Sequence, residues 1–187
     1  MRKDLVTSFP QVGGLYFSWN YDLDQLESEI FVTSILEWVR DLRNETACEV
    51  VIEISEKALY RDVDMGQVVQ NLKRLRLAGI GIALDDFGFE HSNVQRLIEL
   101  PISVIKLDRC LVHEIDDKPE NLSTIRHIAN LARELNIKVI AEGVENERQV
   151  MLLNQCEIYA HQGYHYAKPF DPNVNQRHLH VLRNRMN

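Results

Sequence analysis

The chain has 187 residues, of which 45% are hydrophobic and 26% charged, as expected of one globular domain with a buried core. Its net charge of −7 argues against binding to duplex DNA or RNA, which requires clustered Lys and Arg side chains. No stretch approaches the ~20 consecutive apolar residues of a membrane span.

Short apolar runs alternate along the chain with longer amphipathic patterns. The short runs predict six strands, at Leu15–Trp19, Val50–Ile54, Gly79–Leu84, Ser103–Leu107, Lys138–Ala141 and Ile158–His161. Several of these runs are apolar nearly throughout, which is typical of parallel strands that are covered on both faces.

Helices are predicted between the strands, where apolar residues recur at every third or fourth position. One helix spans about 64–77, and Gly79 follows it where a left-handed cap is needed. A second spans about 125–135. Asn146 is expected to cap a third helix with Gln149 as its partner, and a final helix is predicted over Val174–Arg185.

The strands follow one another at intervals of roughly 20 to 35 residues, which is the length of one βα unit. Repeated βα units form either an open doubly wound sheet or a (β/α)8 barrel. No glycine-rich nucleotide-binding loop follows the first strand. A complete barrel needs ~250 residues, so the chain is predicted to be a single α/β domain over residues 1–187, a TIM-type barrel that lacks units.

Polar residues fall at the ends of successive predicted strands. Listed in chain order, they are Asn20, Glu53, Asp85 with Asp86, Lys106 with Asp108, and Glu142 with Glu145. The carboxyl ends of parallel barrel strands meet at one rim, where barrel active sites lie. We therefore expect these side chains to converge on one site.

The residue types at this rim indicate metal chemistry. Carboxylates and an amide oxygen are hard ligands suited to Mg²⁺ or Mn²⁺. An adjacent pair such as Asp85 and Asp86 can bridge one metal ion and bind a second, and two ions ~3.5–4 Å apart can promote hydrolysis of a phosphodiester. Lys106 would orient the attacking water or stabilise charge on the phosphoryl oxygens.

Five motifs together resemble those of the EAL family, in that family's order and spacing. They are Ile52-Glu53-Ile54-Ser55-Glu56, Leu84-Asp85-Asp86-Phe87-Gly88, Ile105-Lys106-Leu107-Asp108, Ile140-Ala141-Glu142-Gly143-Val144-Glu145, and Gln162-Gly163-Tyr164 up to Lys168-Pro169. The resemblance covers about residues 15–175. It implies hydrolysis of the bacterial signal cyclic di-GMP to pGpG by a metal-dependent phosphodiesterase.

The resemblance also implies a role for each matching residue. It makes Asn20, Glu53 and Asp85 ligands of one metal ion and assigns Asp86 to the second. Glu142 resembles a second-metal ligand or general base, and Lys106 the water-orienting lysine. The resemblance further implies that Gln162 completes the rim, that Glu145 supports the metal ligands, and that Glu56 anchors the loop after Asp86.

Two departures from the family pattern predict impaired activity. The family's first strand carries an E-x-L-x-R motif whose Glu is a metal ligand and whose Arg contacts a substrate phosphate, and no such motif precedes residue 15. The loop after Asp86 reads Phe89-Glu90 where the family has Thr-Gly. The alternative function is a non-catalytic module that binds cyclic di-GMP or a protein partner. A missing first unit would leave an open barrel edge, which a homodimer would cover.

Structural interpretations of these residues remain open. Strand-end carboxylates can cap helices or pair with lysines, Lys106 can be a simple ion-pair partner, and Asn20 can cap the next helix. Glu145 could equally support the metal ligands or contact the metal ion itself. The histidine pairs His161 with His165 and His178 with His180 are expected in the core or on the surface. The three separated cysteines indicate reduced thiols, so we expect a cytoplasmic protein.

Overall fold

The computed structural model describes residues 15–45, 48–88 and 94–168. In this part of the chain six strands form one parallel sheet, ordered as in the sequence. They are β1 (Leu15–Asn20), β2 (Cys48–Ser55), β3 (Gly81–Phe87), β4 (Val104–Leu107), β5 (Lys138–Ala141) and β6 (Ala160–His161). Consecutive βα units with crossovers of one hand produce this order. The predicted α/β architecture is therefore confirmed.

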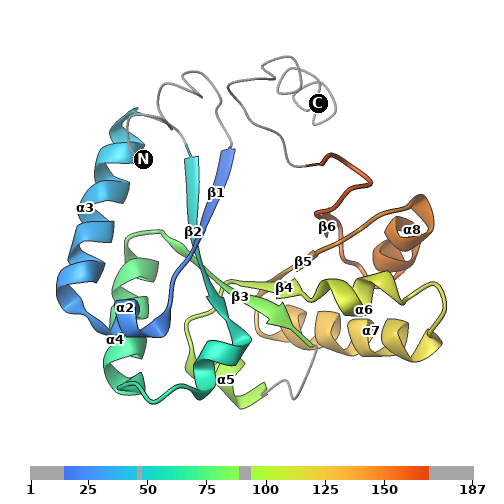
Figure 1. Cartoon of the computed structure of the whole chain (residues 1–187), viewed down its shortest axis with the longest axis horizontal. Helices are drawn as coiled ribbons and strands as arrows, with labels where there is room; N and C mark the ends of the chain where they lie inside the picture. Colours follow the sequence, from blue (N-terminus) through green and yellow to red (C-terminus); the bar gives the residue numbers. More distant parts are fainter. Residues whose placement is uncertain (1–14, 46–47, 89–93, 169–187) are drawn as a thin grey trace.

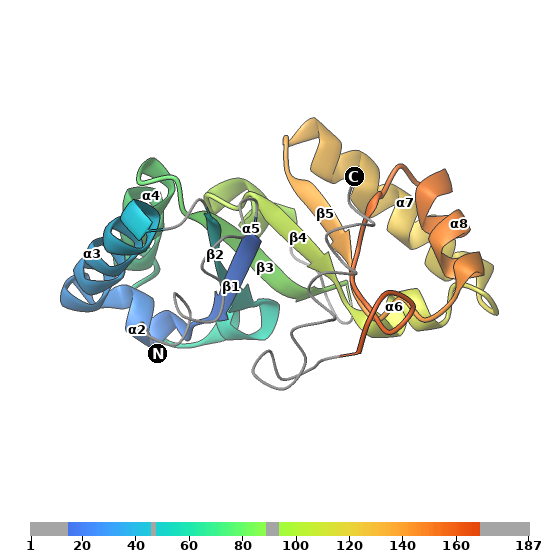
Figure 2. The same cartoon turned by 90° about the horizontal axis from the view of Figure 1, so that it is seen from above.

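Helices connect the strands and pack along the sheet. They are α2 (Leu23–Glu27), α3 (Glu29–Glu45), α4 (Met65–Leu77), α5 (Val94–Glu99), α6 (Arg109–His113), α7 (Pro119–Glu134) and α8 (Glu147–Gln155), with a 3₁₀ helix η1 at Glu56–Tyr60. The sheet lies between α3 and α4 at one end of the molecule and α7 and α8 at the other (Figures 1 and 2). No helix of the described part is long and apolar enough to cross a membrane.

The caps of two predicted helices explain where those helices begin and end. Asp64 caps α4 by accepting a hydrogen bond from the Gln67 backbone, and Gly79 ends it with a φ of +76°. The Asn146 side chain accepts from the Gln149 backbone, as predicted. The Gln149 side chain, however, accepts from the backbone of Glu145, so the expected reciprocal bond to Asn146 is shifted by one residue.

Several predicted bounds differ from the structure: α7 begins at Pro119 and not near residue 125, and β6 begins at Ala160 and not at Ile158. Strand β3 begins two residues later than predicted and extends to Phe87, so both aspartates lie inside it. The helix predicted over Val174–Arg185 lies outside the described residues. Helix α3 has no predicted counterpart, although Val32, Ile35 and Val39 carry helical spacing and are buried.

The two faces of the sheet differ in what they carry. Alternate residues such as Ile52, Leu84 and Ile105 belong to the main core. The residues between them form a separate small cluster of Val51, Ala83 and Val104, with Ile140 packed against it. Successive side chains of a strand point to opposite faces, so this cluster marks the inner face of an open part of a barrel. Beside it lies a cavity of about 540 Å³.

A buried amide joins α4 to the end of α2. Asn71 is fully buried, and its side chain donates hydrogen bonds to the carbonyl oxygens of Leu26 and Glu27 at 2.9 and 3.1 Å. Asn71→Leu should therefore lower the free energy of unfolding by about 1–3 kcal/mol, because both carbonyl groups lose their donor. Urea denaturation measures the change. Asn154→Ala on the exposed surface of α8 is the control, and an equal loss there would contradict this explanation.

Candidate metal and catalytic site

The site is formed by the residues that follow the small apolar layer of the inner face. Moving two residues along a strand returns to the same face. Two positions beyond Val51, Ala83, Val104 and Ile140 stand Glu53, Asp85, Lys106 and Glu142. Alternation within four successive strands therefore places three carboxylates and one ammonium group on one face of the sheet, as the strand-end pattern predicted.

The pairing of the strands extends this set at both edges of the sheet. Asn20 at the end of β1 lies opposite Glu53 in the β1–β2 register. In the β4–β5 pairing Lys106 lies opposite Ile140, two residues before Glu142. The site residues of these two strands are therefore staggered, as the tilted strands of a barrel require. Gln162 directly follows β6, and its backbone N–H donates to the Ala141 carbonyl at 2.8 Å.

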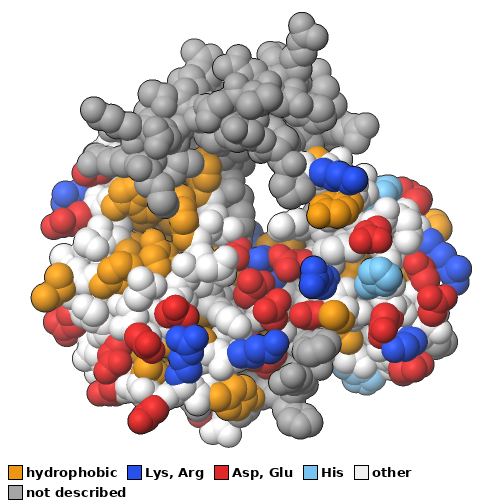
Figure 3. Space-filling model, in the orientation of Figure 1, with side chains coloured by type: hydrophobic (Ala, Val, Ile, Leu, Met, Phe, Trp, Pro, Cys, Tyr) orange, Lys and Arg blue, Asp and Glu red, His pale blue; other side chains and the backbone are white. Residues whose placement is uncertain are grey.

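Lys106 is the centre of the site. Its ammonium nitrogen lies 2.9 Å from Glu53, 3.1 Å from Asp85 and 2.7 Å from Glu142, so carboxylates from β2, β3 and the end of β5 meet at one cation. Lys106 is 6% exposed and Glu53 is 5% exposed. Acidic side chains gather near the middle of the face shown in Figure 3, between the helices on either side.

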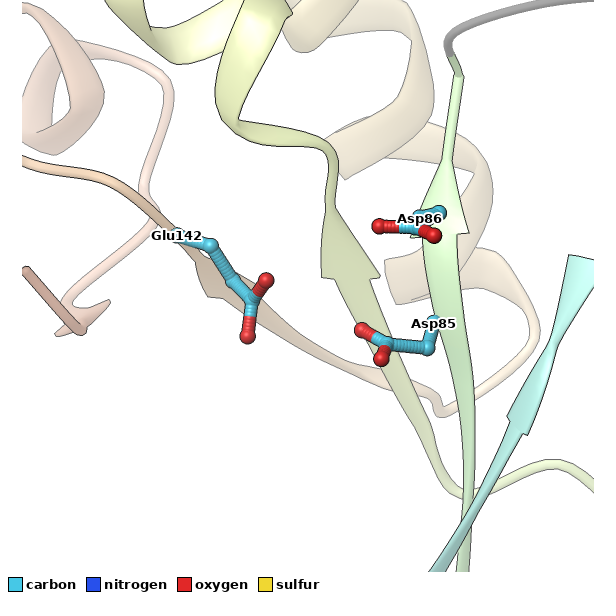
Figure 4. A group of neighbouring side chains, drawn as sticks. All are labelled: Asp85, Asp86 and Glu142. Atoms are coloured by element: carbon cyan, nitrogen blue, oxygen red, sulfur yellow. The ribbon is translucent and has the colours of Figure 1, made fainter. Parts of the chain in front are cut away.

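A local irregularity of β3 turns two adjacent aspartates toward the same site. In a regular strand Asp85 and Asp86 would point to opposite faces. The β3–β4 register shifts between Leu84 and Phe87, and Asp86 adopts a left-handed φ of 58°. Aspartate tolerates this conformation better than most residues. Both carboxylates are consequently directed toward Glu142 at the end of β5 (Figure 4).

Asp85, Asp86 and Glu142 lie close enough together that they could hold one cation. Each offers one oxygen, and these three atoms lie within 4.8 Å of one another. Among the described residues, no donor reaches the buried Asp85 Oδ1 in hydrogen-bonding geometry, although Lys106 is near it. An oxygen of this kind is suited to a metal ion, and an all-oxygen set suits a hard divalent cation.

Burial and the crowded charges change the pKa values of the site. Burial raises the pKa of Glu142, and the Lys106 ammonium opposes this effect only in part. Burial also raises the pKa of Asp86, assisted by the charges of Asp85 and Asp108. Burial by itself would lower the pKa of Lys106, but its bonds to Glu142 and Glu53 outweigh this and raise it. Lys106 therefore stays a cation at neutral pH.

Four other residues were predicted to belong to the site or to support it. Asn20 and Gln162 have exposed side chains at the two edges of the sheet. Glu145 is not in the cluster and faces His113, with 3.9 Å between His113 Nε2 and Glu145 Oε2. Glu56 is buried, and its Oε2 accepts a hydrogen bond from the Gly88 backbone at 3.4 Å.

Two nearby residues received no role from the sequence. Asp108 caps α6 by accepting a hydrogen bond from the Cys110 backbone at 2.6 Å. Its negative charge and the positive charge of Lys57 both act on Asp86, in opposite directions. The strand-end position of Asp108 was a readable signal for its place at the rim. Nothing in the local sequence of Lys57 indicated that it lies near Asp86.

The described histidines are engaged away from the acidic cluster. His161 contacts the Ile158 carbonyl at 2.7 Å and the Tyr166 hydroxyl at 2.8 Å, and His165 lies 3.3 Å from Glu147. These contacts agree with the core-or-surface interpretation of this pair. His178 and His180 lie outside the described residues.

Comparison with known proteins identifies the family. The family model of the EAL domain matches residues 5–169. This chain belongs to the EAL domain family. The EAL chain is 38% identical over 120 residues to the cyclic di-GMP phosphodiesterase RocR of Pseudomonas aeruginosa, a match covering 64% of the chain and 30% of RocR. It is 35% identical over 156 residues to the probable cyclic di-GMP phosphodiesterase PdeG of Escherichia coli, covering 83% and 30%.

A solved structure supports the same assignment. The EAL domain of Mycobacterium smegmatis DcpA superposes with a TM-score of 0.76 at 28% identity, over 88% of this EAL chain and 72% of that one. The six described strands thus form an open part of the TIM-type α/β barrel of the EAL family, as predicted. The matched region spans less than a third of the length of RocR or PdeG.

Proposed function

We propose that this EAL domain hydrolyses cyclic di-GMP to the linear dinucleotide pGpG with the help of divalent metal ions. The observation that carries the proposal is the convergence of Glu53, Asp85 and Glu142 on Lys106 at the carboxyl ends of parallel strands. Relatives that share this family are named for the same substrate and reaction. Mg²⁺ or Mn²⁺ fits the all-oxygen donor set.

The acidic group supplies the binding site for these ions. Asp85, Asp86 and Glu142 would hold one ion or bridge two, with Glu53 and Asn20 as further ligands beside Asp85. When bound, the metal ions supply Lewis-acid activation of water and neutralise charge on the phosphodiester. Glu56 supports the group indirectly, because its bond to Gly88 holds the backbone two residues after Asp86.

The protein's own side chains provide orientation and proton transfer. We assign Glu142 the general-base role, because its carboxylate lies in the acidic cluster and 2.7 Å from the Lys106 ammonium. Lys106 remains protonated and lies 2.7 Å from Glu142, where its ammonium can orient the attacking water and stabilise phosphoryl charge. Gln162 and Glu145 would act at the rim, around substrate and ligands.

Incubation of the chain with cyclic di-GMP tests the proposal. We expect pGpG to accumulate with Mn²⁺ or Mg²⁺ and to stop when a chelator is added, as followed by chromatography of the nucleotides. Cyclic AMP is the control substrate and should not be consumed. Absence of pGpG at saturating metal would reject the catalytic function for this chain.

A second candidate is a non-catalytic module that binds cyclic di-GMP or a protein partner. It is favoured by Phe89-Glu90 in place of the family's Thr-Gly. Calorimetry separates the two candidates, because the binding module takes up nucleotide without forming pGpG. A chain that binds neither nucleotide nor metal would retain only the protein-interaction role. We also predict that the chain forms a homodimer, and light scattering of the chain in solution tests this prediction.

A further inference from the structure

We propose that Lys106 is an internal counter-cation that holds the carboxylates of the site together before metal arrives and competes with the first divalent ion for them. The inference rests on the proposed metal site. It adds a property of this chain's own lysine: the residue assigned to orient water would also set the affinity for metal and the stability of the metal-free protein.

The contacts of Lys106 and of the candidate metal ion overlap. Glu142 and Asp85 belong to the group whose oxygens lie within 4.8 Å of one another, and both also lie within 3.1 Å of the Lys106 nitrogen. The lysine and the metal ion could use different oxygens of the same carboxylate. The Lys106 ammonium and the metal ion would still lie only a few ångströms apart. They repel each other strongly in a partly buried site.

The charges of the site favour an exchange. Glu53, Asp85, Asp86 and Glu142 with Lys106 carry a formal charge of −3 when all are ionised. One divalent ion reduces this to −1 and a second reverses it to +1, which suits an anionic phosphodiester. Once metal takes Asp85 and Glu142 as ligands, Lys106 would lose its contacts to these two carboxylates and would be freed toward the substrate.

The burial of Lys106 distinguishes this arrangement from an ordinary surface ion pair. Lys118, for example, forms an ion pair with Glu114 at 2.7 Å, and both of these side chains are about half exposed. Surface pairs of that kind contribute little to stability. Lys106 instead has three carboxylate partners and is 6% exposed, so its removal leaves buried negative charges without compensation.

Titration of the metal-free chain with Mn²⁺ in a calorimeter tests the proposal. Lys106→Met removes the charge and keeps the length of the side chain, and Lys106→Gln removes the charge and keeps a donor. We expect both variants to bind the first Mn²⁺ roughly tenfold or more tightly than the unmodified chain. Lys118→Met is the matched control and should bind Mn²⁺ with unchanged affinity.

Thermal unfolding gives a second measurement that does not depend on catalysis. Without metal, the Lys106 variants should unfold about 5 °C or more below the unmodified chain, and saturating Mn²⁺ should narrow the gap. Unchanged or weaker Mn²⁺ binding by folded Lys106 variants would overturn the proposal while leaving the metal site intact. If the unmodified chain binds no Mn²⁺, both the proposed function and this inference fail.

The unmodified chain provides a test if neither variant folds. Lysines are acetylated with and without Mn²⁺, and the modified positions are quantified by mass spectrometry. Release from Asp85 and Glu142 should make Lys106 react faster with Mn²⁺ present, relative to Lys118 in the same sample. Equal or slower reaction of Lys106 would count against the exchange.

Discussion

Glu142→Gln is expected to lower the rate of pGpG formation by about 10²–10³-fold in the presence of Mn²⁺. Glu142 belongs to the group of three acidic residues suited to a cation, and it lies 2.7 Å from Lys106. The amide keeps the size of the side chain but loses the negative charge and the ability to accept a proton. The nucleotide products are separated by chromatography, and calorimetry should also show weaker Mn²⁺ binding.

The matched control for this prediction is Glu134→Gln. Glu134 is the last residue of α7 and its side chain is exposed. It leads into β5 at the end opposite the rim, so the same chemical change there should leave the rate within about twofold, as surface substitutions commonly do. Comparable loss of activity in both variants would show that Glu142 acts through overall stability and not at the site.

Gly163→Ala is expected to lower the free energy of unfolding by about 3 kcal/mol. A Cβ atom at this position would lie only 2.1 Å from the Val144 carbonyl oxygen and 2.3 Å from its nitrogen. Both are backbone atoms, so no side-chain rotation relieves the overlap. Hydrogen bonds from Val144 N–H to Gln162 and from His165 N–H to Val144 would be strained at the same point.

Urea denaturation measures this effect, with Gly66→Ala as the control. A Cβ at Gly66 meets only Asp64 Oδ1, the oxygen that caps α4, at 3.1 Å, and the preference of alanine for the helix offsets any small shift of this cap. We expect the Gly66 variant to stay within about 1 kcal/mol of the unmodified chain. A Gly163 variant of equal stability would mean that the close packing of Val144 is not required.

The outline of the fold was predictable because its signals are local. Apolar runs such as those of β2 and β4 mark buried parallel strands whatever surrounds them. Asp64, Gly79 and Asn146 likewise determine helix ends through contacts within a few residues. Helix α3 carried the same kind of signal in Val32, Ile35 and Val39.

The sequence by itself determined which groups stand at the ends of successive strands: carboxylates, an amide and one lysine, in the order of the EAL family. Only the tertiary structure decided how they meet. Lys106 and Glu53 are 53 positions apart, so no local pattern specifies their contact. The register shift that turns Asp86 beside Asp85 depends on how β3 pairs with β4. Glu145 lies on the loop between β5 and α8, beyond the part of the chain where the alternation of a strand sets the direction of side chains. Its side chain faces His113 and not the acidic cluster.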